Sequence, residues 1–187
     1  MTQYRKPANI PGTQEKLPPH DNEAEDAVIG SLLVDGDIID GAPSVVMDWL
    51  LPNDFFGERN KWIYQACMQL YRRKEGINEI TVARELAHDE KLEKVGGAAF
   101  LSHLISIVPT PFHILYYGGI VSRLAVAREF INAGGEITRK AFRISSENDI
   151  QSCLAELDQL RDYLADEVLR AMGQPNTQPI IKGGVIL

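Results

Sequence analysis

The side chains in this sequence with the clearest chemical potential are cysteines, histidines and clustered carboxylates. The thiols and imidazoles are those of Cys67, Cys153, His20, His88, His103 and His113. A zinc site needs such residues at short, regular spacings, and these histidines stand at no ligand spacing from one another or from a cysteine. Both cysteines fall within helical apolar patterns, which favours buried, reduced thiols. The sequence therefore predicts no metal site.

Two groups of carboxylates could hold metal ions or act as acids and bases. The first group, Glu23, Glu25 and Asp26, follows His20 closely, and we interpret it as helix-terminal acids that match the positive end of a helix dipole. The second group lies along residues 147–172. Its members are Glu147, Asp149, Glu156, Asp158, Asp162, Asp166 and Glu167. A di-metal carboxylate bundle needs Glu-x-x-His motifs on facing helices, so this group indicates a solvated face.

The sequence motifs of common enzymes are absent from this chain. It contains no G-x-x-x-x-G-K-[ST] loop, not even a Gly-Lys pair, and no G-x-S-x-G, H-E-x-x-H or G-x-G-x-x-G motif. We therefore expect no catalytic residue, no metal and no cofactor in this chain. An enzyme that uses an unrecognised site is the remaining catalytic alternative.

Composition and charge narrow the class of protein. The chain has 187 residues, of which 44% are hydrophobic and 24% charged, as in ordinary globular proteins. Its net charge of −7 opposes the coating of nucleic acid, so we expect weak single-stranded DNA binding at most. Apolar runs are shorter than the ~20 residues that span a bilayer, and residues 1–16 do not resemble a signal peptide. We expect a cytoplasmic protein that does not enter membranes.

The elements that must position any functional surface begin after a polar arm, residues 1–17. Pro18 and Pro19 end this arm, and Asp21 or Asn22 can cap the helix that follows. With Asn22 as the cap, Glu25 would complete a capping box. An apolar stripe predicts the buried face of this helix: Ala24, Val28, Ile29, Leu32 and Leu33.

Residues 18–110 predict a globular subdomain of about five or six short helices. Further helices are expected over residues 41–50, over 60–73 with Gly76 as the stop, from Thr81, and over 98–106 after the turn at Gly96. Phe55 and Phe56 are expected as buried anchors in the turn between the second and third helices. No alternating strand pattern is present, so the fold class is all-α.

Residues 111–172 predict a long antiparallel helical hairpin. Its arms cover about residues 112–142 and 147–172, joined by a short break capped by Ser145 or Ser146. The second arm has an apolar seam at Ile150, Leu154, Leu157, Leu160, Leu164 and Val168, and its acidic faces can pair with basic residues near the end of the first arm.

The first arm is more apolar than pairing with a single helix requires, because one partner needs only a stripe of ~100°. The surplus predicts a second partner, either the globular subdomain or another copy of the chain. The pairs Gly118–Gly119 and Gly134–Gly135 favour close backbone approach or a bend, since a helical glycine costs about 1 kcal/mol relative to alanine.

Six stretches taken together resemble the N-terminal domain of bacterial replicative DNA helicases of the DnaB type. In order, they are "PPHDNEAEDAVIGSLL", "LLPNDFF", "KWIYQACMQLYRRKEGINEITVARELA", "KLEKVGGAAFLSHL", "VPTPFHILYYGGIVSRLAVAREFI" and the second hairpin helix. No single stretch is chemically diagnostic, but their order and spacing are jointly specific over residues 18–172.

The resemblance implies a small helical globule followed by a hairpin that pairs between neighbouring subunits. In that family a hexamer carries these domains as a collar, a trimer of dimers, on a ring of RecA-like ATPase domains that translocates 5′ to 3′ on single-stranded DNA. The collar docks the primase and, in several systems, bears on helicase loading. ATP and Mg²⁺ are implied only for the motor domain, which is missing from this sequence, and residues 173–187 are expected to form the linker toward it.

The sequence therefore predicts a non-catalytic collar domain for ring assembly and for docking of primase and a helicase loader. We expect self-association and partner docking through apolar and basic positions of the hairpin: Tyr117, Val121, Leu124, Arg128, Ile131, Leu157 and Leu164. The alternative is a free-standing helicase-like adaptor or inhibitor that binds primase or helicase subunits.

Overall fold

A computed structural model describes residues 17–34, 42–108 and 110–172, and within these ranges the regular structure is helical, without a β-strand. The chain is therefore all-α, as the sequence predicts. The α-helices are α1 (Asn22–Val34), α2 (Ala42–Trp49), α3 (Glu58–Arg73), α4 (Glu79–His88), α5 (Leu92–Val95), α6 (Gly97–Ile107), α7 (Ile114–Ala141) and α8 (Glu147–Met172). Two short 3₁₀ turns, η1 (Pro52–Asp54) and η2 (Pro111–His113), precede α3 and α7.

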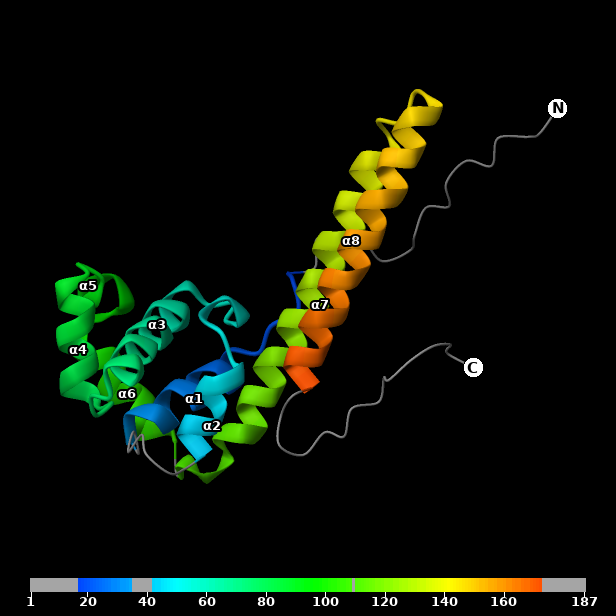
Figure 1. Cartoon of the computed structure of the whole chain (residues 1–187). Helices are drawn as coiled ribbons and strands as arrows, with labels where there is room; N and C mark the ends of the chain where they lie inside the picture. The colour runs from blue at the N-terminus through cyan, green and yellow to red at the C-terminus, as the bar shows by residue number, and fades with distance from the viewer. Residues whose placement is uncertain (1–16, 35–41, 109, 173–187) are drawn as a thin grey trace.

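Helices α1 to α6 gather into a globule, from which α7 and α8 project together as a long hairpin (Figure 1). The base of α7 lies within the globule, where it packs against α1 and α2. The division of the chain at residues 110 and 111 stays a prediction. Residues 1–16 of the expected arm (residues 1–17) and the expected linker over residues 173–187 lie outside the described residues.

Helix α1 forms the centre of the globule between α6 and α7. Its predicted buried stripe is confirmed, because Val28, Ile29 and Leu32 are fully buried. Asp21 caps the helix: its side chain accepts a hydrogen bond of 3.0 Å from the Ala24 amide. Of the two predicted caps, Asp21 is thus the one used, and the capping box that depended on Asn22 as the cap does not form.

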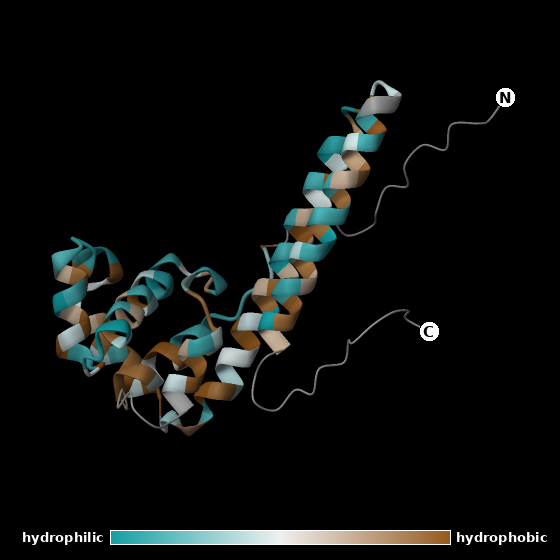
Figure 2. Ribbon diagram, viewed as in Figure 1, coloured by the Kyte–Doolittle hydropathy of each residue, from teal (hydrophilic) through white to brown (hydrophobic). Residues whose placement is uncertain are grey.

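Close backbone approach holds α1 against α6. A Cβ atom on Gly30 would overlap the backbone carbonyl oxygen of Leu104 and press on the Val108 side chain. Only glycine fits at this crossing without displacing α6. Figure 2 shows hydrophobic residues concentrated over α1 and α2 and at the base of the hairpin, where this packing takes place.

Two helix boundaries differ from the sequence prediction for local reasons. Helix α3 ends at Arg73, with Lys74 in the left-handed region at φ 58°, so the stop comes before Gly76. Helix α4 begins at Glu79 because the Asn78 side chain accepts hydrogen bonds from the Ile80 and Thr81 amides, at 3.0 and 3.1 Å. The Thr81 hydroxyl accepts from the Asn78 amide in return, which completes a capping box.

The hairpin arms have nearly the predicted bounds. Ser146 caps α8 through its hydroxyl, which accepts from the Asp149 amide, and the Asp149 carboxylate accepts from the Ser145 and Ser146 amides. These reciprocal bonds lower the pKa of Asp149. In the described ranges no single helix meets the length and hydropathy of a membrane span; only α6 with residues 111–141, bent by 86°, meets them together.

The two glycine pairs of α7 have different surroundings. A Cβ on Gly118 would lie 3.0 Å from the Trp49 ring of α2, so the first pair permits close packing on the globule, as predicted. A Cβ on Gly134 or Gly135 would meet no atom within 4 Å. Within the described chain, the second pair therefore supports no close approach.

We expect Gly30→Ala to lower the free energy of unfolding by about 1–3 kcal/mol, because the added methyl group overpacks the α1–α6 crossing. Gly134→Ala is the matched control, and it should raise stability by up to ~1 kcal/mol, since alanine favours the helix and meets open space. Urea denaturation measures both. A neutral Gly30→Ala would contradict the close packing described above.

Candidate association surface on the helical hairpin

The base of the hairpin is anchored by an ion pair between its last turn and the η1 turn. Arg170 of α8 donates to both carboxylate oxygens of Asp54, at 2.8 and 2.9 Å, and to the Trp49 carbonyl at 2.9 Å. Asp54 is only 3% exposed, and its carboxylate also accepts from the Leu51 amide. A buried carboxylate is stable only when paired in this way, so α8 is fixed to the globule here.

A second arginine attaches α7 to the same place. Arg128 donates to the Pro19 carbonyl at 2.8 Å and to the Asp54 carbonyl. Its guanidinium carbon lies 5.8 Å from the centre of the Phe56 ring, and Phe56 also stacks on His20, with ring centres 4.3 Å apart. Phe56 is 37% exposed. The prediction that it is a buried anchor like Phe55 is therefore wrong, because Phe56 lies at the surface, stacked on His20 and next to Arg128.

Glu25 connects α1 with the same turn. It is 1% exposed and accepts from the backbone amides of Phe56 and Gly57, at 2.6 and 3.0 Å. Glu25 does lie in the first turn of α1, as predicted, but the prediction missed these distant contacts. Glu25 is a buried structural carboxylate whose partners lie more than thirty residues later in the chain.

The pKa values of the two anchoring arginines are shifted in opposite directions. Burial lowers the pKa of Arg128 against the attraction of Glu25 and Asp54. Burial also opposes the charge on Arg170, but hydrogen bonds to Asp54 and Glu167 outweigh it and raise the pKa. Both side chains stay charged at neutral pH, so the attachment does not depend on pH near 7.

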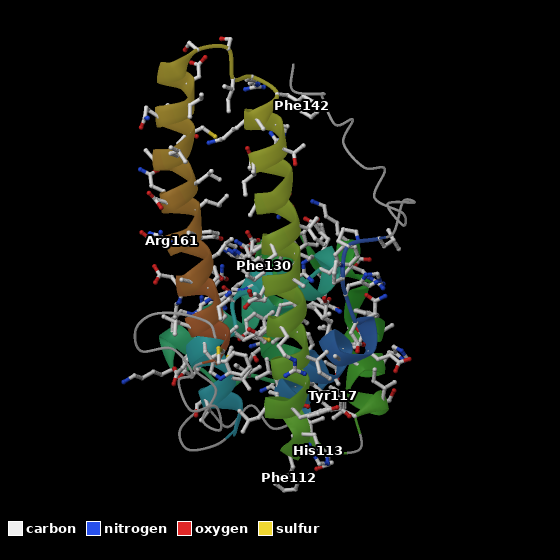
Figure 3. All side chains as sticks on the ribbon, turned by 90° about the vertical axis from the view of Figure 1, so that its right-hand side faces the viewer. Phe112, His113, Tyr117, Phe130, Phe142 and Arg161 are labelled. Atoms are coloured by element: carbon white, nitrogen blue, oxygen red, sulfur yellow. The ribbon has the colours of Figure 1, made fainter. Side chains whose placement is uncertain are left out.

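Above this anchor, the two arms pack on each other and leave an apolar groove between them. The groove has a volume of about 540 Å³. Its walls are formed by Phe130, Ile137, Leu157, Leu160, Arg161, Leu164, Ala165, Val168 and Leu169. Phe130 is 52% exposed and Leu169 is 47% exposed. Figure 3 shows Phe130 midway along α7 and Arg161 pointing away from α7.

A second hollow of about 580 Å³ shares Ile137, Leu157 and Leu160 with the groove but has a more polar rim. Lys140 of α7 pairs there with Glu156 of α8, and the Tyr163 hydroxyl donates to Glu129 at 3.3 Å. The predicted electrostatic pairing between the arms is thus present at Lys140. Of the seam residues, Ile150 and Leu154 are exposed and the other four are half-buried, because each arm has one helical neighbour over this length.

The structure distributes the seven predicted association residues among several environments. Leu157 and Leu164 line the groove. Val121 is buried in the chain's own core and Arg128 is held by the globule, whereas Ile131 is 57% exposed. Tyr117 and Leu124 are half-buried, and Figure 3 places Tyr117 near the base of α7. These residues do not form one surface, and their role in association stays a prediction.

Sequence reasoning left several groove residues out of that set. They are Phe130, Ile137, Leu160, Val168 and Leu169. The seam spacing already contained Leu160 and Val168, and the apolar surplus of the first arm contained Phe130 and Ile137. What the pattern lacked was the rotation of each arm about its own axis, which the anchor at the base determines.

Reactive chemistry is sparse in the described part of the chain. Burial raises the pKa of the Cys67 thiol to about 12, which keeps it protonated and unreactive. Cys153 is half-buried on the hairpin. Among the described residues, no three His, Cys, Asp or Glu side chains stand close enough to hold a metal ion.

Known proteins match most of the chain, including the globule and the first part of α7. The profile described as "DnaB-like helicase N terminal domain" matches residues 17–123. The replicative DNA helicase DnaB of Geobacillus stearothermophilus is 33% identical over 144 residues, which are 77% of this chain and 30% of that protein. The DnaB of Haemophilus influenzae is 30% identical over 168 residues, 90% of this chain and 34% of that protein. The chain thus spans about a third of these relatives.

Solved structures have the same fold. The crystal structure of the N-terminal domain of DnaB helicase from Mycobacterium tuberculosis matches with a TM-score of 0.66 and 33% identity, covering 76% of this chain and 99% of that one. A DnaB-like replicative helicase, studied for its interactions with primase, matches with a TM-score of 0.60 over 80% of this chain and 35% of that one. At 23% identity, this second likeness concerns the fold alone.

We expect Asp54→Asn to lower the free energy of unfolding by about 2–3 kcal/mol, because it leaves Arg170 partly buried without its counter-charge. Asp158→Asn is the control: it breaks an ion pair with Arg161 in which both side chains are more than half exposed, and it should cause no measurable loss. Chemical denaturation separates the two. Equal effects would show that the anchor is no stronger than a surface pair.

The two thiols should react at very different rates. In the folded chain an alkylating reagent such as iodoacetamide should label Cys153, whereas Cys67 is fully buried and protonated. Mass spectrometry should find one label on the native chain and two labels on the urea-unfolded chain. Rapid native labelling of Cys67 would mean that the globule opens locally.

Proposed function

Because the chain belongs to the family of DnaB-like helicase N-terminal domains, we propose that it acts as the non-catalytic collar of a hexameric replicative helicase. In this proposal its hairpin joins neighbouring subunits, and the unwinding of DNA is carried out by a separate ATPase domain of the larger protein. The chain corresponds to about a third of its relatives, so ATP hydrolysis and translocation belong to the larger protein.

The observation that supports this role is the groove between α7 and α8. Two helices cannot enclose a core by themselves, since each needs more than one neighbour to bury a broad apolar face. A second hairpin laid against the first would complete a four-helix arrangement and bury Phe130, Leu169 and their neighbours. Burying a large apolar side chain completely contributes roughly 1.5–3 kcal/mol relative to leaving it exposed, so several half-exposed side chains can support a dimer.

The same collar is proposed to dock a primase and a helicase loader. Family membership supports this part, and the exposed aromatic residues at the two ends of α7 offer sites for it. Phe112 is 82% exposed at the base, and Phe142 is 83% exposed beside the turn at the tip. Both are labelled in Figure 3 and lie apart from the groove.

We expect the isolated chain to form dimers through the groove, and Phe130→Asp to weaken this association by at least about tenfold, or 1.4 kcal/mol. The reason is that a carboxylate in an apolar interface must lose its water without gaining a partner. Sedimentation velocity over a concentration series measures the effect.

Phe112→Asp is the matched control, because it introduces the same charge at a more exposed phenylalanine outside the groove. It should leave the dimer intact. A wild-type chain that stays monomeric at high micromolar concentration, or equal effects of the two substitutions, would contradict association through the groove.

A further inference from the structure

Helix α4 presents a second shallow groove on the far side of the globule from the hairpin (Figure 1). It has a volume of about 350 Å³ and is lined by Glu79, Ile80, Ala83, Arg84, Ala87, Leu92 and Ala98. Its floor is apolar and contains three alanines. Ile80 stands at its edge and is 65% exposed, among the most exposed large aliphatic side chains in the described ranges.

The groove and its edge have complementary shapes. Ile80 and Arg84 are one turn apart and form a ridge along α4, while Ala83, Ala87 and Ala98 leave a hollow beside it. Ridges formed by residues four apart pack into the grooves of a facing helix. The ridge of one copy of this chain therefore fits the hollow of another, and the small alanine side chains let the two helices approach closely.

The charges beside the groove are also complementary between two copies of the chain. Glu79 and Arg84 are five residues apart, which places them about 140° apart around the helix, on opposite edges of its exposed face. If two α4 helices lie side by side and parallel about a two-fold axis, the Glu79 edge of each adjoins the Arg84 edge of the other. Among the described residues Arg84 is exposed and has no hydrogen bond or ion pair, so it is available for such a contact.

We propose that α4 is a second self-association surface, at which the Ile80–Arg84 ridge of each copy enters the alanine-lined groove of the other and Arg84 pairs with Glu79. A second copy suits this surface better than a strongly charged partner. One acid and one base flank the groove, so a partner of a single charge sign would leave one of them unmatched. The surface does not depend on the hairpin and goes beyond the function proposed above.

The size of the groove indicates a weak contact when it acts alone. Its contribution increases when hairpins already hold copies together, since the second contact then forms at a high effective concentration. Two different two-fold surfaces on one chain link copies alternately, so the assembly grows in pairs and can close only into rings with an even number of chains.

Charge reversal with mixing tests the proposal. Arg84→Glu and Glu79→Arg each place like charges across the contact and should weaken it by at least about tenfold. An equimolar mixture of the two variants restores both ion pairs, so association should return to near the wild-type level. The α4 substitutions are made in the wild-type chain and in the Phe130→Asp chain, and sedimentation equilibrium measures the size of the assemblies. In the wild-type background, species larger than dimers indicate the α4 contact. In the Phe130→Asp background, any dimer indicates it.

Arg72→Glu is the matched control, because Arg72 is an exposed arginine of α3 outside the groove and the substitution changes the net charge equally. It should leave the larger species intact. Equal weakening by Arg72→Glu, or no recovery on mixing, overturns the α4 contact. If Arg84→Glu removes the larger species but Phe130→Asp leaves the dimers intact, the α4 contact is supported and the proposal of association through the hairpin is contradicted. Thermal melting confirms that each variant is folded.

Discussion

The arrangement of this protein depends on the neutralisation of one buried carboxylate. Asp54 lies where the η1 turn, α2, α7 and α8 meet, and its charge is matched by Arg170 from the last turn of α8. Arg128 holds the backbone of the same residue from α7. Because an unpaired charge at this depth would be costly, both arms are held at a defined angle to the globule. The direction in which the hairpin projects follows from these two arginines.

Packing on the hairpin changes along its length. The base of α7 is buried in the globule, whereas its outer part is exposed. Near the base, α7 has the globule beside it: Gly118 lies against Trp49, and Val121 joins the core. Farther out, its neighbour is α8, and Phe130 and Ile131 are more than half exposed. One helix thus serves as a core element at one end and as an open surface at the other. The apolar surplus of its sequence covers both uses.

Local sequence patterns predicted the elements but not their distant contacts. The all-α class, the buried stripe of α1 and the bounds of the hairpin arms follow from periodicity and caps, which act within a few residues. The contacts of Glu25 and the exposure of Phe56 were missed because their partners, the turn after η1 and Arg128, are distant in sequence. The groove was half-predicted for the same reason: the seam spacing indicates which residues of α8 face inward, but the rotation of α7 is determined by the anchor at its base.

The sequence separation within the anchor has a consequence for the order of folding. Asp54 and Arg170 are 116 residues apart, so during synthesis all residues of α1 to α6 have left the ribosome long before the counter-charge of Asp54 does. Contacts of such long range form late, because the intervening chain must first be ordered. The nascent globule therefore carries an unpaired acidic turn until α8 folds back along α7. Closure of the hairpin is then the step that completes the globule, and a chain interrupted before Arg170 would lack it.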